Sequence, residues 1–173
     1  MAILPLRMVP DLVLRHRAKR VRHIDGSIQR LVADMIDTMQ EAHGAGLAAN
    51  QVGVLQRVMV IQLPEEEPMV FINPEITERE GEREVVEGCL SIPGYRGYLI
   101  RSIKVKARGL DLHGKLFRVK ADASTELERE EILAQALEHE IDHLNGILYI
   151  DHLESHEKLH KLEPEEAPVE ASG

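Results

Sequence analysis

The stretch His139-Glu140-Ile141-Asp142-His143 carries two histidines four residues apart, with a glutamate directly after the first. On an α-helix, residues at this spacing lie on one face, one turn apart, so both imidazoles can bind the same metal ion. The glutamate then lies beside the metal rather than on it, where it can transfer a proton. A metal site needs more than two protein ligands, so the remaining ligand has to come from elsewhere in the chain.

The chain contains a single cysteine, Cys89, which excludes a disulfide within the chain. Cys89 lies in the sequence Glu87-Gly88-Cys89-Leu90-Ser91, where the preceding glycine allows the backbone to turn sharply. A lone cysteine is commonly a buried apolar residue, but this surrounding sequence favours a metal ligand. Cys89, His139 and His143 then form a His₂Cys set that leaves a fourth position for water, which is typical of a catalytic metal site.

Composition and charge restrict the class of protein. A chain of 173 residues is most simply one domain, and 43% hydrophobic and 29% charged residues are ordinary for a soluble globular protein. The net charge of −9 argues against a general nucleic-acid coat. No apolar run approaches the roughly 20 residues that span a bilayer, and residues 1–10 lack the pattern of a signal peptide. The basic segment at residues 15–22 is either a solvated strip or a binding patch.

The first predicted helix covers residues 25–43, where apolar residues recur at three- and four-residue steps. Asp25 or Ser27 can cap its amino terminus. Gly44 follows its end, where a residue in the left-handed conformation is favourable. The sequence therefore predicts an amphipathic helix in the amino-terminal part of the chain.

A second, longer helix is predicted around the histidine motif. It begins near Thr125, which forms a capping-box pattern with Glu128, and it ends at Asn145-Gly146. Alternating or β-branched segments predict strands between the helices, and the charged residues 75–87 suit an exposed edge or hairpin. The predicted strands cover residues 57–63, 68–73, 100–107 and 115–120. One helix, several strands and one long helix, in that order, indicate an α+β fold.

Three motifs follow one another along the chain: GAGLAANQ at residues 44–51, EGCLS at 87–91 and HEIDH at 139–143. Together they resemble the peptide deformylase family, and the likeness extends over about residues 1–153. This resemblance implies antiparallel β-sheets packed around a central metal-binding HExxH helix. We therefore expect a single catalytic domain at residues 1–153, followed by an acidic carboxy-terminal tail at residues 154–173 whose end is disordered.

The resemblance also implies an activity and a set of functional residues. Members of this family are metal-dependent hydrolases that remove the N-formyl group from the initiator methionine of nascent polypeptides and release formate. The family's metal ligands correspond to Cys89, His139 and His143, and its general acid and base corresponds to Glu140. Its oxyanion-stabilising groups correspond to Gln51 and the backbone N–H of Leu90. Its substrate-binding positions correspond to Gly46, Arg96, Ile132, Gln135 and Ala136.

Expectations for the cofactor and partners follow from the same resemblance. We expect one divalent metal ion per chain, iron(II) in the cell, with zinc, nickel or cobalt as substitutes, because nitrogen and sulfur ligands of intermediate softness accept all of these. The expected partners are a formyl-methionine peptide substrate and, transiently, the ribosome. We expect no membrane and no sequence-specific nucleic acid. The expected state is a monomer in the bacterial cytoplasm.

Three positions near the motif need a structural explanation. Glu138 stands where the family usually has glutamine, and we expect its carboxylate either to raise the pKa of a metal ligand or to point to solvent. Gln135 is more polar than expected for a methionine pocket, which leaves the strength of methionine selectivity open. Asp142 faces away from the metal on a regular helix, and we expect it to form an ion pair with Arg101.

Two other functions are compatible with the histidine motif alone. One is a zinc endopeptidase, which usually takes its third ligand downstream of the motif, here from Glu154 or His156. The other is a catalytically inactive relative that only binds a metal. A structural site is normally closed by a fourth protein ligand, and the chain has no second cysteine to supply one.

Overall fold

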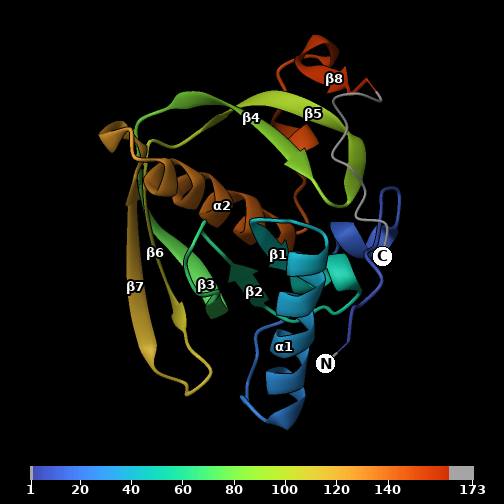
Figure 1. The fold of residues 1–173 in the computed structure, drawn as a ribbon, viewed down its shortest axis with the longest axis vertical. Coiled ribbons are helices and arrows are strands. Elements are labelled where there is room, and N and C mark those ends of the chain that lie inside the picture. Colours follow the sequence, from blue (N-terminus) through green and yellow to red (C-terminus); the bar gives the residue numbers. More distant parts are fainter. Residues whose placement is uncertain (1, 164–173) are drawn as a thin grey trace.

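The computed structural model describes residues 2–163, and it has a mixed fold with two α-helices and two antiparallel sheets. Helix α1 spans Gly26–Glu41 and helix α2 spans Glu128–Leu144. Figure 1 shows α2 lying between the sheets. The predicted α+β class is therefore confirmed. The predicted disorder at the end of the tail concerns residues 164–173, which lie outside the described residues.

The larger sheet has five strands in the order β1-β2-β3-β6-β7, and every neighbouring pair is antiparallel. Its strands are β1 (Gly46–Ala48), β2 (Val58–Ile61), β3 (Met69–Glu80), β6 (Lys104–Leu110) and β7 (Leu116–Asp122). The smaller sheet has the order β4-β5-β8, formed by β4 (Arg83–Cys89), β5 (Ile92–Arg101) and β8 (Leu159–Lys161). Short 3-10 helices connect these elements: η1 (Leu12–Arg15), η2 (Ala49–Val52), η3 (Ala123–Thr125), η4 (Tyr149–His152) and η5 (His156–Lys158).

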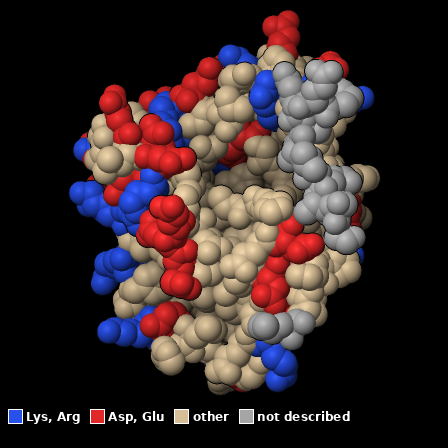
Figure 2. Space-filling view, in the orientation of Figure 1, with Lys and Arg blue, Asp and Glu red and all other residues tan. Residues whose placement is uncertain are grey.

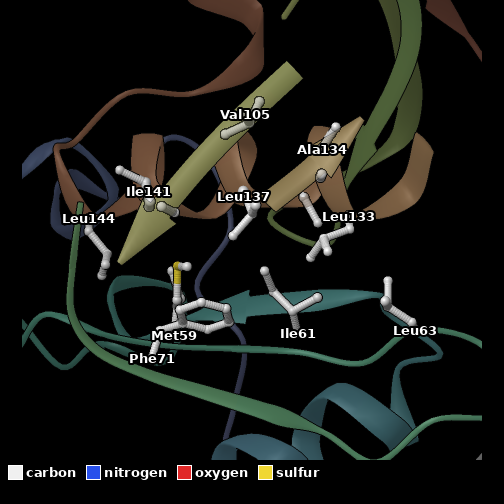
Figure 3. Packing of buried hydrophobic residues seen from close by; sticks show 14 of the residues in the cluster. Met59, Ile61, Leu63, Phe71, Val105, Leu133, Ala134, Leu137, Ile141 and Leu144 are labelled. Carbon is white, nitrogen blue, oxygen red and sulfur yellow. The ribbon is translucent and has the colours of Figure 1, made fainter. Parts of the chain in front are cut away.

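Strand β2 is covered by a helix on each face. Val58 and Val60 belong to the hydrophobic cluster that contains the buried residues of α1. Met59 and Ile61 point the other way and pack with α2 (Figure 3). Alternate residues of a strand face opposite sides of the sheet, so a strand covered on both faces has to be apolar at every position. This explains the uninterrupted Val-Met-Val-Ile run.

Helix α2 contributes more buried residues to the larger core than any other element. Its apolar face carries residues spaced by three and four positions, which pack on Met59, Ile61 and Phe71 of the sheet (Figure 3). Those buried helix residues are Leu133, Ala134, Ala136, Leu137, Ile141 and Leu144. Because this face is fixed against the sheet, the direction of every other α2 side chain is fixed too.

The ends of the helices differ in part from the predictions. Asp25 caps α1, and its side chain accepts hydrogen bonds from the backbone N–H groups of Ser27 and Ile28. The left-handed residue after α1 is His43, with φ of 55°, and not Gly44. The predicted start of α2 at Thr125 is wrong, because Thr125 ends η3 and Glu126 adopts a left-handed conformation with φ of 61°. A left-handed residue breaks the helical backbone, so α2 begins only at Glu128.

The strand predicted at residues 100–107 is two strands in different sheets. β5 ends at Arg101 and β6 begins at Lys104, so the chain passes from one sheet to the other at residues 102–103. The charged residues 75–87 form the end of β3, a turn at Gly81 and most of β4. Part of the predicted tail is ordered, since β8 pairs with β5. Among residues 2–163, no helix is both long and apolar enough to cross a bilayer.

Gly146 turns the chain directly after α2, and its replacement tests how tightly this turn is packed. Gly146 has φ of 75°, and an added Cβ would lie 2.5 Å from the backbone oxygen of Arg15. Gly94 has φ of 81°, but an added Cβ would meet no atom within 4 Å. A left-handed conformation costs an alanine about 1–2 kcal/mol, so both substitutions should lower the free energy of unfolding. Gly146→Ala should lower it clearly more in urea denaturation, and equal losses would show that the close contact is easily relieved.

Candidate functional site

Three potential ligand atoms converge beside α2. Nε2 of His143 lies 3.2 Å from Nε2 of His139 and 3.3 Å from Sγ of Cys89. The three atoms lie within 4.8 Å of one another. The histidines come from successive turns of α2, and Cys89 is the last residue of β4. The structure thus brings together residues that are fifty positions apart in the sequence.

These residues fit a divalent metal ion. In a tetrahedral site with metal–nitrogen distances of about 2.0–2.1 Å, neighbouring nitrogen ligands lie about 3.3 Å apart, close to the spacing seen here. A thiolate and two imidazoles are ligands that zinc, iron(II), cobalt and nickel accept. Three protein ligands also leave a coordination position for water or substrate, which is a feature of catalytic rather than structural sites.

Glu87 fixes the orientation of His139. A carboxylate only accepts hydrogen bonds, so Nδ1 of His139 donates to Oε1 of Glu87, at 2.5 Å. In the neutral ring, which is the form that can bind a metal, this bond places the proton on Nδ1 and leaves Nε2 directed at the other two ligand atoms. Glu87 belongs to the EGCLS motif, but its role was not predicted, because nothing in the sequence shows that β4 lies against this turn of α2.

Arg101 holds Glu87 in turn. Its Nε and Nη2 atoms donate to the two carboxylate oxygens of Glu87 at 2.7 and 2.8 Å, and its Nη1 donates to Asp142 at 2.7 Å. The predicted ion pair between Asp142 and Arg101 is therefore confirmed. Burial alone would raise the pKa of Glu87, but the hydrogen bonds from Arg101 and His139 outweigh it and hold the pKa at about 2. Glu87 therefore stays ionised at any physiological pH.

Glu140 lies beside the ligand cluster without joining it. Its Oε1 is 3.9 Å from Nε2 of His139, and its buried Oε2 has no hydrogen-bond partner among residues 2–163. Burial raises the pKa of Glu140 to about 7. Gly46 makes room for this carboxyl group, because a Cβ there would lie 2.8 Å from Oε1. A carboxyl group with this pKa can both accept and return a proton near neutral pH.

Gln51 presents its amide N–H groups to the cluster. Its Oε1 accepts a hydrogen bond from the backbone N–H of Ala48 at 3.0 Å, which fixes the direction of the amide. Its Nε2 then donates to Oγ of Ser91 at 3.2 Å and lies 3.7 Å from Sγ of Cys89. Leu90 follows Cys89 in the chain, and both Leu90 and Gln51 line a cavity beside the cluster. Ser91 was not predicted to contribute.

All of the predicted substrate-binding residues line one cavity of about 1300 Å³. Figure 2 shows the hollow on this face of the molecule, with acidic side chains visible in and beside it. The cavity is bounded by β1, residues 132–140 of α2 and the connection between β4 and β5. The predicted residues in its wall are Gly46, Gln51, Cys89, Leu90, Arg96, Ile132, Gln135, Ala136, His139 and Glu140. Gln135 donates a hydrogen bond from Nε2 to the backbone oxygen of Val86 at 3.0 Å.

Glu138 does not point to solvent, so that alternative is wrong. Its side chain is buried, and its carboxylate accepts hydrogen bonds from the backbone N–H of Ser102 at 2.7 Å and from the Ser102 hydroxyl at 3.1 Å. Arg79 pairs with it at 3.1 Å. Glu138 therefore ties α2 to the connection between the two sheets, next to Arg101.

Comparison with known proteins decides the family. Residues 3–159 match the family model described as Polypeptide deformylase. The chain belongs to the polypeptide deformylase family. A peptide deformylase from Dehalococcoides mccartyi (strain CBDB1) is 54% identical over 167 residues, which is 96% of this chain and 95% of that protein. A peptide deformylase from Thermodesulfovibrio yellowstonii is 47% identical over 155 residues, covering 87% of this chain and 89% of that protein.

Solved peptide deformylases have the same fold. The crystal structure of one from Legionella pneumophila is 43% identical with a TM-score of 0.82, and the match covers 90% of this chain and 88% of that one. The deformylase from Synechococcus elongatus, solved in complex with actinonin, is 40% identical with a TM-score of 0.82, covering 90% of this chain and 81% of that one. Within the described residues, the convergent ligand group of this deformylase is Cys89, His139 and His143, and neither Glu154 nor His156 belongs to it.

The contact between Glu87 and His139 predicts an effect on metal affinity. Glu87→Gln should weaken metal binding by about 10–100-fold, because an amide cannot orient and polarise the imidazole as a carboxylate does. Cobalt affinity can be measured by competition with a chromophoric chelator. Glu84→Gln is the matched control, since Glu84 lies on the same strand but is exposed. Equal affinities in the two variants would show that Glu87 serves only the ion pair with Arg101.

Proposed function

We propose that this chain removes the N-formyl group from the amino-terminal methionine of newly made peptides and releases formate. The observation that carries the proposal is the His₂Cys ligand group with a buried carboxyl group, Glu140, beside it in the wall of a large cavity. Membership of the polypeptide deformylase family supports the same reaction. The helix α2, lying between the sheets, is proposed to be the metal-binding HExxH helix of residues 1–153, the proposed catalytic domain.

The chemistry divides between the metal and the side chains. A bound divalent ion would supply a water of strongly lowered pKa and would polarise the formyl oxygen. Cys89, His139 and His143 would hold the ion. Glu140 takes the proton from the water and later delivers it to the amine that leaves, which its pKa of about 7 allows. The metal's identity is proposed to be iron(II), with zinc, nickel or cobalt as substitutes.

The oxyanion of the tetrahedral intermediate needs hydrogen-bond donors that are already in place. Gln51 offers one, because the bond between its Oε1 and the Ala48 N–H directs its Nε2 toward the cluster. The backbone N–H of Leu90, directly after the ligand Cys89, is the second proposed donor. Loss of one such donor typically lowers the rate by about 10²–10³-fold.

The substrate is proposed to bind along β1 as an added strand. β1 is an edge strand of the five-stranded sheet, and Gly46 in it lines the cavity. An extended peptide can pair with such an edge through its backbone. Ile132 and Ala136 lie one turn apart on α2 and form an apolar wall for the methionine side chain. The amide of Gln135 is bound to Val86, so its polar end does not oppose an apolar ligand.

The remaining expectations stay predictions. Arg96 is proposed to contact the substrate, since it lines the cavity beside β8. The monomeric state, the transient contact with the ribosome and the bacterial cytoplasmic location follow from the family resemblance alone. The endopeptidase alternative loses its support, because its downstream ligands, Glu154 and His156, lie outside the ligand group within the described residues.

Glu140→Gln separates proton transfer from metal binding. The amide occupies the same volume but cannot accept a proton, so formate release from formyl-Met-Ala-Ser should fall by about 10²–10⁴-fold. Metal content, measured on anaerobically prepared iron(II) protein, should stay near one per chain. Glu128→Gln, at the exposed start of the same helix, should leave the rate unchanged. A Glu140→Gln enzyme with full activity would overturn the proposed role of this residue.

Cys89→Ser distinguishes the deformylase from an endopeptidase. A serine hydroxyl does not ionise near neutral pH, so the variant should lose most of its metal and its formate release. Glu154→Gln should keep both, although an endopeptidase that used Glu154 as its third ligand would give the opposite pair of results. Retention of metal by Cys89→Ser together with its loss from Glu154→Gln would therefore reject the proposed ligand set.

A further inference from the structure

A second cavity, of about 470 Å³, lies at the carboxy-terminal end of α2 and shares no lining residue with the first. Four arginines line it: Arg17, Arg20, Arg57 and Arg79. They come from three separate parts of the chain, yet they meet around one space. The concentration of cations is unusual in a protein whose net charge is −9.

The positive charge of this cavity is only partly neutralised. Arg79 pairs with Glu138 at 3.1 Å. Glu75 is the one carboxylate in the wall among the described residues, and it pairs with Arg108. Among residues 2–163, neither Arg17 nor Arg20 forms an ion pair with a carboxylate. The wall therefore carries an excess of positive charge.

Arg57 is held in place by neutral groups. Its Nη1 donates to the backbone oxygen of Leu144 at 3.0 Å, and its Nη2 donates to Oδ1 of Asn145 at 3.0 Å. These bonds satisfy carbonyl groups at the end of α2 but leave the charge of the guanidinium uncompensated. Burial and the neighbouring positive charge of Arg17 both lower the pKa of Arg57. An anion bound between the two would relieve this repulsion.

The backbone segment that carries Arg17 and Arg20 is held by hydrogen bonds to other parts of the fold, without a ligand. The N–H of Ala18 donates to the backbone oxygen of Leu144 at 2.8 Å. Asn73 binds Val21 twice, accepting from its N–H at 2.8 Å and donating to its oxygen at 2.9 Å. A segment anchored on both sides loses little further backbone freedom when its side chains bind a ligand.

We propose that this cavity is a binding site for a phosphate group. Guanidinium groups bind phosphate oxygens through paired, charge-assisted hydrogen bonds, and several of them around one space suit a tetrahedral anion better than a planar carboxylate. The volume exceeds that of a single phosphate, so the group can belong to free phosphate or to the backbone of a nucleic acid. The site is separate from the deformylase cavity and does not depend on the proposed reaction.

Titration calorimetry of the full chain with inorganic phosphate at low salt tests the site directly. Wild-type protein should bind, and the double variant Arg17→Glu/Arg20→Glu should bind at least about tenfold more weakly, because two charge-assisted contacts become repulsive. The matched control is Lys19→Glu/Arg22→Glu, which changes the net charge equally in the same segment but at side chains outside the cavity. This control should keep most of the affinity.

A second titration, with a single-stranded RNA oligonucleotide, distinguishes the sources of the phosphate. RNA binding that is weaker and less salt-dependent in Arg17→Glu/Arg20→Glu, and unchanged in the control, identifies a nucleic-acid backbone. Phosphate binding without RNA binding identifies a free anion. No phosphate binding by the wild type, or equal losses in the two double variants, would overturn the proposal. Unchanged formate release by both variants verifies that they are folded.

Discussion

One buried carboxylate, that of Glu87, links the elements that form the candidate metal site. The candidate ligands come from two elements, with Cys89 on β4 and the two histidines on α2. Glu87 bonds to His139 on one side and to Arg101 on the other, and Arg101 reaches on to Asp142 of α2. Burying such charges costs free energy unless each finds partners, and here each does. The network therefore fixes where β4 lies on α2, and with it the distance between the sulfur and the imidazoles.

Glu140 is also a buried carboxyl group, but its pKa is raised whereas that of Glu87 is lowered. Glu87 receives three hydrogen bonds and keeps its charge, whereas one oxygen of Glu140 has no partner within the described chain. Both residues are almost fully buried, so the difference in their pKa values comes from hydrogen bonding rather than from exposure. Of the two carboxyl groups on either side of His139, one is thus a permanent anion and the other is the proposed proton carrier.

The sequence predicted what depends on local spacing and missed what depends on the pairing of distant segments. The spacing of His139 and His143 placed both on one helical face, and Cys89 stood out because it has no alternative in the chain. The bond between Glu87 and His139 could not be predicted, since it depends on how β4 lies across α2. The same holds for the division of residues 100–107 between two sheets, because alternation continues through the break at Ser102. Because Glu126 is left-handed, α2 begins later in the chain than predicted. The capping pattern in the sequence does not reveal this left-handed residue.

Helix α2 or its C-cap residue contributes to the walls of both cavities described above. Its residues from Ile132 to Glu140 contribute to the wall of the larger cavity, and Ile141 and the C-cap residue Asn145 line the arginine-rich one. Carbonyl groups at that end carry partial negative charge, which favours a cation such as Arg57. The carbonyl groups at the end of the helix therefore hold the Arg57 side chain in place. Its positive charge remains available to an anion. Glu138 precedes His139 in the chain, and its ion-pair partner Arg79 lines the arginine-rich cavity. An anion there would compete with Glu138 for Arg79.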